Sequence, residues 1–189
     1  NLKSRQRRTQ SKQSFLPDYQ AWLDQKLLQI EPLPANEAAM FAWLLIWQVD
    51  TGNFLRALEL LAFALERDIQ APREFERSLI ELATEEISLD LLQREQCAPQ
   101  AALLVQLAEL VVGQDMADPI QAKLYKAQGL AYFTAQPDKA ITYFQQAQAL
   151  SGSIGVKRYL NQLTRPNRPQ QAKQQLAAYQ LSARAAAQL

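Results

Sequence analysis

The 189-residue sequence contains no histidine, which excludes Ser-His-Asp and Cys-His nucleophile systems and histidine-ligated metal sites. The single cysteine, Cys97, excludes a disulfide framework within the chain and a cysteine-based zinc site, and we interpret it as a free thiol packed as a small hydrophobe. None of the five glycines lies in a phosphate-cradling loop, which excludes a P-loop ATPase. The apolar run that contains Met40 to Trp47 is too short to span a bilayer, so we expect a cytosolic protein without a membrane partner.

The residue types that are abundant favour helices. Ala, Leu, Gln, Glu and Arg dominate, and alternating runs of Val, Ile and Thr are missing. We therefore predict an all-α fold. Proline and glycine positions and hydrophobic period predict helices over residues 17–30, 36–50, 54–68, 74–95 with a break near residue 88, 99–112, 118–135, 137–150, 153–163 and 170–189.

Two stretches resemble each other in form, Trp47–Arg67 and Leu130–Leu150. Each is predicted to hold a helix end, a turn and a second helix with small and aromatic residues in phase. The corresponding positions are Ala57, Leu61 and Ala64 in the first stretch and Ala140, Phe144 and Ala147 in the second. Alanines at this spacing let two helices approach closely, as in tetratricopeptide hairpins. This predicts antiparallel helical hairpins, partly tetratricopeptide-like.

The helix patterns also predict a core. We expect it to include Trp43, Leu44, Trp47, Leu58, Leu61, Leu65, Leu130, Tyr132, Ile141 and Phe144. Trp47→Ala is expected to be among the costliest single changes in this core, because truncating a buried tryptophan costs about 3–5 kcal/mol.

Charge is strongly segregated along the chain. Residues 1–13 hold five basic residues and no acid, residues 14–138 hold 8 basic and 19 acidic residues, and residues 139–189 hold seven basic residues and no acid. This pattern predicts an acidic body with flexible basic ends. The predicted parts are a basic arm at 1–14, a helical core domain at 15–164, and a basic linker with a C-terminal helix at 165–189.

Basic ends attract a polyanion such as DNA, and arginine and lysine are the side chains that neutralise phosphates. The alternative is an ordinary solvated surface that keeps the protein soluble. The candidate DNA-binding residues are Lys3, Arg5, Arg7, Arg8 and Lys12 near the N-terminus and Lys157, Arg158, Arg165 and Arg168 in the C-terminal part.

Carboxylates are the remaining candidates for catalysis. Glu74, Glu76, Glu81, Glu85, Glu86 and Asp90 lie close together in the sequence. A two-metal nuclease needs several converging acids, whereas a solvated helix face with intrahelical partners such as Arg73–Glu76 and Arg77–Glu81 needs none. We favour the helix face, assign no catalytic, metal or cofactor-binding residue, and leave open whether the protein is an enzyme.

Two blocks resemble a known family in order and spacing. They are WLLIWQVDTGNFLRALELLAFALERD at residues 43–68, and DMADPIQAKLYKAQGLAYF followed by DKAITYFQQAQAL and GVKRYLNQL at about residues 115–163. The segment FLPDYQAWLD at residues 15–24 fits the same pattern. The chain thus resembles the terminase small subunit of peduovirus-type temperate tailed phages, also called the terminase endonuclease subunit.

The resemblance implies a protein of viral genome packaging in the host cytoplasm. Its implied partners are double-stranded viral DNA at the packaging site, the large ATPase subunit, and other copies of the chain in a homo-oligomer, which we expect to be a ring. Two alternatives remain: a helical-repeat scaffold that binds protein without binding DNA, and a metal-dependent endonuclease subunit that uses the acids between Glu74 and Asp90.

Overall fold

The computed structural model describes residues 4–165, and within that range it consists of eight α-helices and no strand. The helices are α1 (Arg5–Leu27), α2 (Ala35–Asp50), α3 (Phe54–Glu66), α4 (Leu79–Gln93), α5 (Ala101–Val111), α6 (Asp118–Tyr132), α7 (Pro137–Leu150) and α8 (Lys157–Thr164). The predicted all-α fold is confirmed. The helix predicted over residues 170–189 lies outside the described residues.

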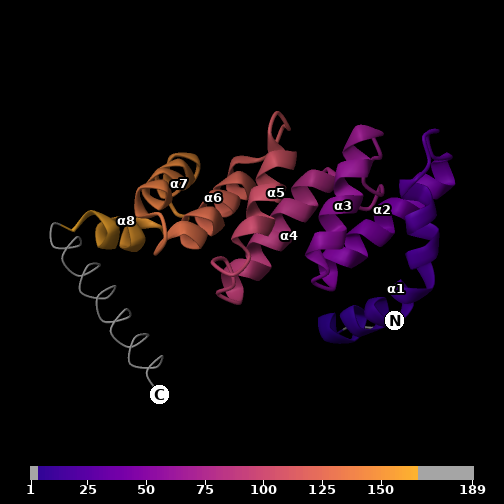
Figure 1. Ribbon diagram of the computed structural model, residues 1–189, viewed down its shortest axis with the longest axis horizontal. Coiled ribbons are helices and arrows are strands. Elements are labelled where there is room, and N and C mark those ends of the chain that lie inside the picture. Colours follow the sequence, from indigo (N-terminus) through magenta and orange to yellow (C-terminus); the bar gives the residue numbers. More distant parts are fainter. Residues whose placement is uncertain (1–3, 166–189) are drawn as a thin grey trace, which may run out of the picture.

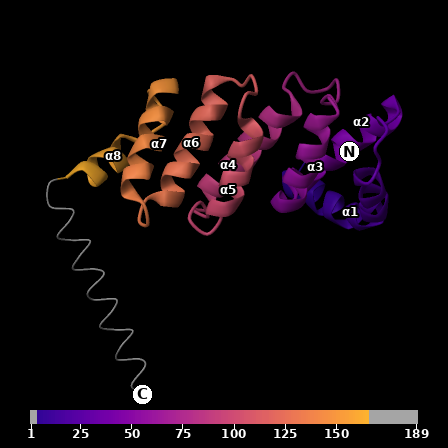
Figure 2. The ribbon, with the colours of Figure 1, turned by 45° about the horizontal axis from the view of Figure 1, so that its top comes forward.

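The helices form an elongated array of hairpins, with α1 at one end and α8 at the other (Figure 1). The pairs α2–α3, α4–α5 and α6–α7 follow one another along the array, and α4 packs on both α2 and α6 (Figure 2). Stacked antiparallel hairpins are the predicted architecture. In the part of the chain that the structure describes, no helix combines the length and apolar composition needed to cross a membrane.

The turn between α2 and α3 shows how local sequence makes a hairpin. Gly52 adopts φ +81°, a left-handed conformation that ends a helix at little cost only for glycine. Asn53 occupies the N-cap position of α3, but its side-chain amide donates to Gln48 Oε1 at 2.9 Å instead of capping the helix. The chain therefore reverses within three residues, and the turn is fastened to the end of α2.

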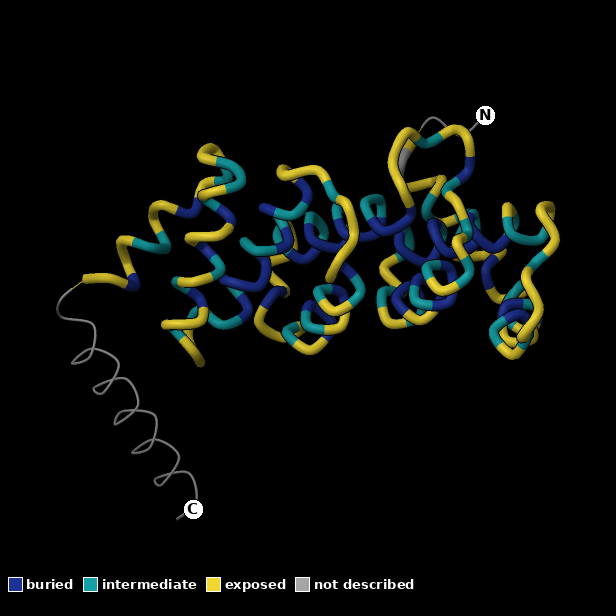
Figure 3. Tube along the Cα trace, turned by 90° about the horizontal axis from the view of Figure 1, so that it is seen from above, coloured by how far each residue is buried: buried dark blue, intermediate teal, exposed yellow. Residues whose placement is uncertain are grey.

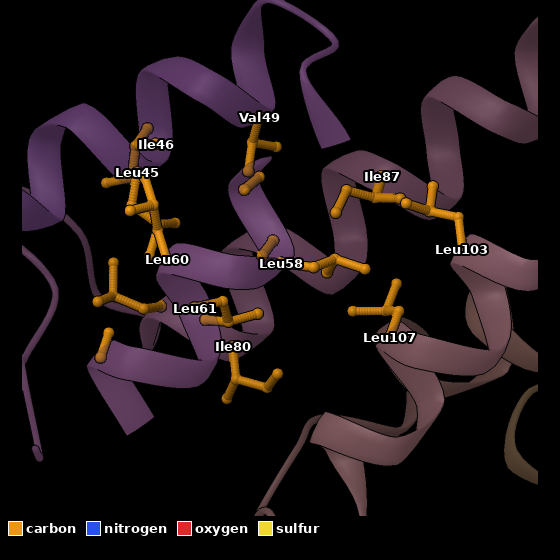
Figure 4. Packing of buried hydrophobic residues seen from close by; sticks show 14 of the residues in the cluster. Leu45, Ile46, Val49, Leu58, Leu60, Leu61, Ile80, Ile87, Leu103 and Leu107 are labelled. Carbon is orange, nitrogen blue, oxygen red and sulfur yellow. The ribbon is translucent and has the colours of Figure 1, made fainter. Parts of the chain in front are cut away.

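One buried apolar cluster runs through the array from α1 to α6. Figure 4 shows leucine, isoleucine and valine side chains of α2, α3, α4 and α5 meeting between the helices, among them Leu61, Ile87 and Leu107. A smaller cluster joins α7 and α8 through Ala140, Phe144, Ala147, Val156 and Leu163. Figure 3 shows buried residues along the middle of the array and exposed residues at its margins and turns.

The six positions that suggested a repeat are all buried. Ala57, Leu61, Ala140, Phe144 and Ala147 are 0% exposed, and Ala64 is 1% exposed. On α6, Gly129 completes the close approach, because a Cβ there would lie 2.4 Å from Cε1 of Phe144. Small residues thus bring the helices of a hairpin together, as the spacing predicted.

Part of the predicted core is less buried than expected. Leu44, Leu58, Leu61 and Phe144 are buried, whereas the other six are half-buried. Of these, Trp47, Leu65, Leu130, Tyr132 and Ile141 pack against the buried clusters, and Trp43 meets Phe75. Phe41 and Leu23, which were not predicted, are fully buried.

Several helix boundaries differ from the prediction, most of all the starts of α1, α4 and α8, of which α8 begins at Lys157 instead of residue 153. The helix α1 begins at Arg5 and passes through Pro17, where a start was predicted, so residues 5–14 are helical and not a flexible arm. The helix α4 begins at Leu79 instead of Glu74, because Ser78 and Glu81 form a capping box that fixes its start. No break occurs at Ser88, which is buried within that helix.

Candidate nucleic-acid interface

The first basic segment is the N-terminal half of α1. Residues such as Arg, Gln and Lys have good helix propensity, which lets this half form a helix without an apolar stripe. Arg7 and Arg8 are exposed, whereas Lys12 is half-buried and forms an ion pair with Asp50 at the end of α2. Leu16, 2% exposed, holds the following turn in the core. The segment is therefore fastened to α2 while two arginines remain open to solvent.

A hollow of about 400 Å³ lies beside this segment, between α1, α2 and α4. Arg8, Thr9 and Lys12 form its α1 side, and Trp43 and Phe75, whose rings meet edge to face at 5.5 Å, are among its apolar residues. Asp50 and Glu86 also line it. This mixture of charges makes the hollow itself a poor site for a phosphate. The better candidates are the exposed Arg7 and Arg8, of which Arg8 also lines the hollow.

The second basic segment lies at the other end of the array. Lys157 and Arg158 are exposed in the first turn of α8, and Arg165 is exposed just after that helix. The Arg158 guanidinium lies 4.5 Å from the centre of the Tyr159 ring and donates a hydrogen bond to the Tyr159 hydroxyl. Two cations at a helix N-terminus oppose the helix dipole, so a bound anion would relieve an unfavourable charge arrangement.

The structure separates the predicted DNA-binding residues into two groups. Arg7, Arg8 and Lys12 belong to α1, and Lys157, Arg158 and Arg165 belong to α8, at opposite ends of the array (Figure 1). Lys3 and Arg168 lie outside the described residues, and nothing is described of the Arg5 side chain. One copy of the chain therefore presents two separated basic surfaces.

The acidic cluster forms caps and ion pairs. Glu81 accepts hydrogen bonds from the backbone N–H groups of Ser78 at 3.1 Å and Ala117 at 3.2 Å. Burial alone would raise the pKa of Glu81, but these hydrogen bonds, one from the Ser78 hydroxyl and the nearby Arg77 charge outweigh burial and lower its pKa below 4.5. The cap thus favours the charged form of Glu81.

The neighbouring acids are also paired. Glu85, whose side chain is 14% exposed, forms ion pairs with both Arg77 and Lys123. Asp90 pairs with Arg94 at 2.9 Å. Within residues 4–165, no three His, Cys, Asp or Glu side chains gather as a metal ion would require. The intrahelical partner predicted for Arg77 was Glu81, whereas its ion pair is with Glu85 one turn further on.

Cys97 is buried and free, as predicted, and burial raises the pKa of its thiol to about 11. A thiol with so high a pKa is a weak nucleophile at neutral pH. Cys97 therefore serves as a packing residue.

The model of one family, the phage small terminase subunit, matches residues 1–119, which include the basic half of α1 and the first two hairpins. The chain belongs to the phage small terminase subunit family. A curated relative, the "Terminase, endonuclease subunit" of Escherichia phage P2, is 27% identical over 179 residues, which cover 93% of this chain and 71% of that protein. No solved structure matches. Membership in this family supports a role in phage DNA packaging.

The sequence resemblance predicted this family, and the comparison confirms it. Sequence analysis missed the aromatic row on the α6–α7 hairpin, where Tyr143 stacks on both Tyr125 and Tyr132. The spacing of Tyr125 and Tyr132, two helical turns apart, was visible in the sequence. Their meeting with Tyr143 depends on the register of the hairpin, which the sequence pattern does not specify.

Proposed function

We propose that this chain is a DNA-binding packaging adaptor that binds double-stranded viral DNA and recruits or regulates the large terminase subunit in the host cytoplasm. The observation that carries the proposal is the exposure of Arg7 and Arg8 on a helix whose basic half contains no acid. The ion pair of Lys12 with Asp50 holds that half against the body. Lys3 and Arg5 extend the same basic segment along the sequence.

The second group contributes less to DNA affinity in this proposal. It has four basic residues over residues 157–168, whereas the first group has five over residues 3–12. In addition, Arg158 is engaged by Tyr159. The role of this second group is to contact phosphates at a distance from α1, so that both ends of the array bind the DNA. Linked weak contacts strengthen one another through effective concentration.

Self-association would strengthen binding in the same way, because every copy adds a basic segment. We propose a homo-oligomer, with the C-terminal segment 170–189 or the Trp22 part of α1 at the subunit contacts. Sedimentation at micromolar concentration, with and without DNA, measures the mass of the assembly. A species that stays monomeric in both conditions contradicts this part of the proposal.

The proposal as a whole is tested by adding the purified chain to a fluorescent duplex in a salt titration. We expect binding that weakens steeply with salt, because phosphate contacts release counterions. The helical-repeat scaffold alternative, which the hairpin array favours, predicts no binding of DNA at any salt concentration. Stimulation of the large subunit's ATPase by the wild-type chain tests recruitment separately.

The endonuclease alternative rests on the acids between Glu74 and Asp90 and on the name of the phage P2 relative. It is tested by incubating a supercoiled plasmid with the chain and Mg²⁺ or Mn²⁺. The capping and pairing of Glu81 and Glu85 argue against a nuclease site there. Nicking that disappears in Glu81→Gln or Glu85→Gln would support the nuclease and contradict our assignment of these acids.

A further inference from the structure

Three tyrosine rings form a row on the α6–α7 hairpin. Tyr143 of α7 stacks on Tyr125 at 6.2 Å between ring centres and on Tyr132 at 5.9 Å, with interplanar angles of 25° and 18°. Tyr125 and Tyr132 lie on one face of α6 because they are two helical turns apart. All three side chains are half-buried, so part of each ring is open to solvent.

A cation completes the row. Lys139, an exposed residue in the first turn of α7, places Nζ 3.9 Å from the centre of the Tyr132 ring and 6.0 Å from that of Tyr143. The hairpin and α8 are more basic than acidic, since residues 118–165 contain six basic residues and two acids, Asp118 and Asp138, although Lys123 is paired with Glu85. The aromatic row therefore lies in a part of the protein that attracts anions.

Packing between the two helices accounts for part of this row, since Tyr125 and Tyr132 also pack against the buried cluster of α7 and α8. The inner face of the hairpin is filled by Ala140, Phe144 and Ala147, each 0% exposed, and by Gly129 against the Phe144 ring. The tyrosines lie at the margin of that contact. Four of the chain's six tyrosines lie in α6, α7 and α8, which concentrates aromatic surface at this end of the array.

The ligand chemistry follows from the combination of rings and charge. Bases stack on aromatic side chains, and phosphates bind cations beside them. The bases of a duplex are already stacked on one another, so only unpaired bases can use the rings. We propose that Tyr125, Tyr132, Tyr143 and Lys139 form a contact surface for single-stranded DNA. This deepens the proposed DNA-binding function and rests on it.

The test uses the full chain and a fluorescent oligothymidylate of about twelve nucleotides, a length within the usual range of such sites. We expect Tyr143→Leu to weaken binding of this single strand about tenfold, and Tyr143→Phe, which keeps the ring, to bind like the wild type. Lys139→Gln should weaken binding and flatten its salt dependence. Tyr19→Leu, a half-buried tyrosine of α1, is the matched control.

A duplex of equal length is measured in parallel. The proposal requires that Tyr143→Leu changes single-strand affinity and leaves duplex affinity unchanged. It is overturned if the wild type does not bind the oligothymidylate, or if Tyr143→Leu and Lys139→Gln bind it like the wild type. Circular dichroism checks that each variant is folded. If Tyr143→Leu unfolds, the test rests on Lys139→Gln, because Lys139 is exposed and its substitution should leave the fold intact. Loss of duplex binding alone would contradict the proposed function and not this surface.

Discussion

Lys12 in the basic half of α1 forms an ion pair with Asp50, the last residue of α2. This contact offsets an unfavourable position for an acid, since a carboxylate at a helix C-terminus opposes the helix dipole. It also fastens a segment that carries little apolar surface of its own. The ion pair and the buried Leu16 therefore help to set the orientation of Arg7 and Arg8 relative to the body.

Asp50→Asn should loosen the basic half of α1 with little effect on the rest of the fold. Partly exposed ion pairs contribute about 0.2–1 kcal/mol, so we expect a small change in the free energy of unfolding and faster hydrogen exchange in residues 5–14. Glu59→Gln, on the exposed face of α3, controls for the loss of one negative charge. Unchanged exchange in residues 5–14 would show that the ion pair does not hold this half of the helix.

Gly129→Ala should destabilise the α6–α7 hairpin. The new Cβ would lie 2.4 Å from the fully buried Phe144 ring, and overpacking of this kind costs about 1–3 kcal/mol, more than the gain in helix propensity. Chemical denaturation measures the change. Gly152→Ala is the matched control, because a Cβ there meets nothing within 4 Å, and equal stability of the two variants would contradict the predicted close approach.

Phe41→Ala should cost more than Trp47→Ala. Phe41 is 0% exposed and its ring lies 5.1 Å from that of Phe63, whereas Trp47 is half-buried at the margin. Truncation of a buried aromatic costs about 3–5 kcal/mol. Thermal and urea unfolding of both variants test this order. A larger loss of stability in Trp47→Ala would mean that Trp47 contributes more to the core than Phe41.

Glu81→Gln should destabilise the protein in a pH-dependent way. The pKa of Glu81 is lowered in the folded protein, so its charge contributes stability above its ordinary pKa of 4.5, and this contribution disappears as the pH falls through the lower folded pKa. The difference in unfolding free energy between the wild type and Glu81→Gln should shrink as the pH falls below 4.5. Glu74→Gln, on an exposed side chain, is the control, and a difference that stays constant with pH would contradict the cap.

Local signals in the sequence predicted much of this fold. Pro137 marks the start of α7 and Gly52 the end of α2, because proline and glycine restrict the backbone directly. The start of α1 could not be found by hydrophobic period, since residues 5–14 have none and are held by a contact with α2. The motif of Ser78 and Glu81 was present in the sequence but was overlooked in favour of the earlier acids.

The candidate site was less predictable than the fold. The segregation of charge along the chain predicted which basic residues are candidates for DNA binding. It could not predict that Lys12 is paired or that α1 and α8 lie at opposite ends of the array. These properties depend on which helices stack on one another. The tyrosine row likewise joins residues of two helices through the register of their hairpin.

The central claim is that the basic half of α1 binds duplex DNA. Its most direct test is the duplex affinity of Arg7→Ala/Arg8→Ala as a function of salt, beside the charge-matched control Arg73→Ala/Arg94→Ala on exposed residues of the acidic body. Each lost phosphate contact should reduce the slope of log affinity against log salt by about 0.9. We expect the α1 variant to bind more weakly with a slope flatter by about 1.8 and with unchanged helix content. Equal slopes and affinities for the two double variants would contradict the account.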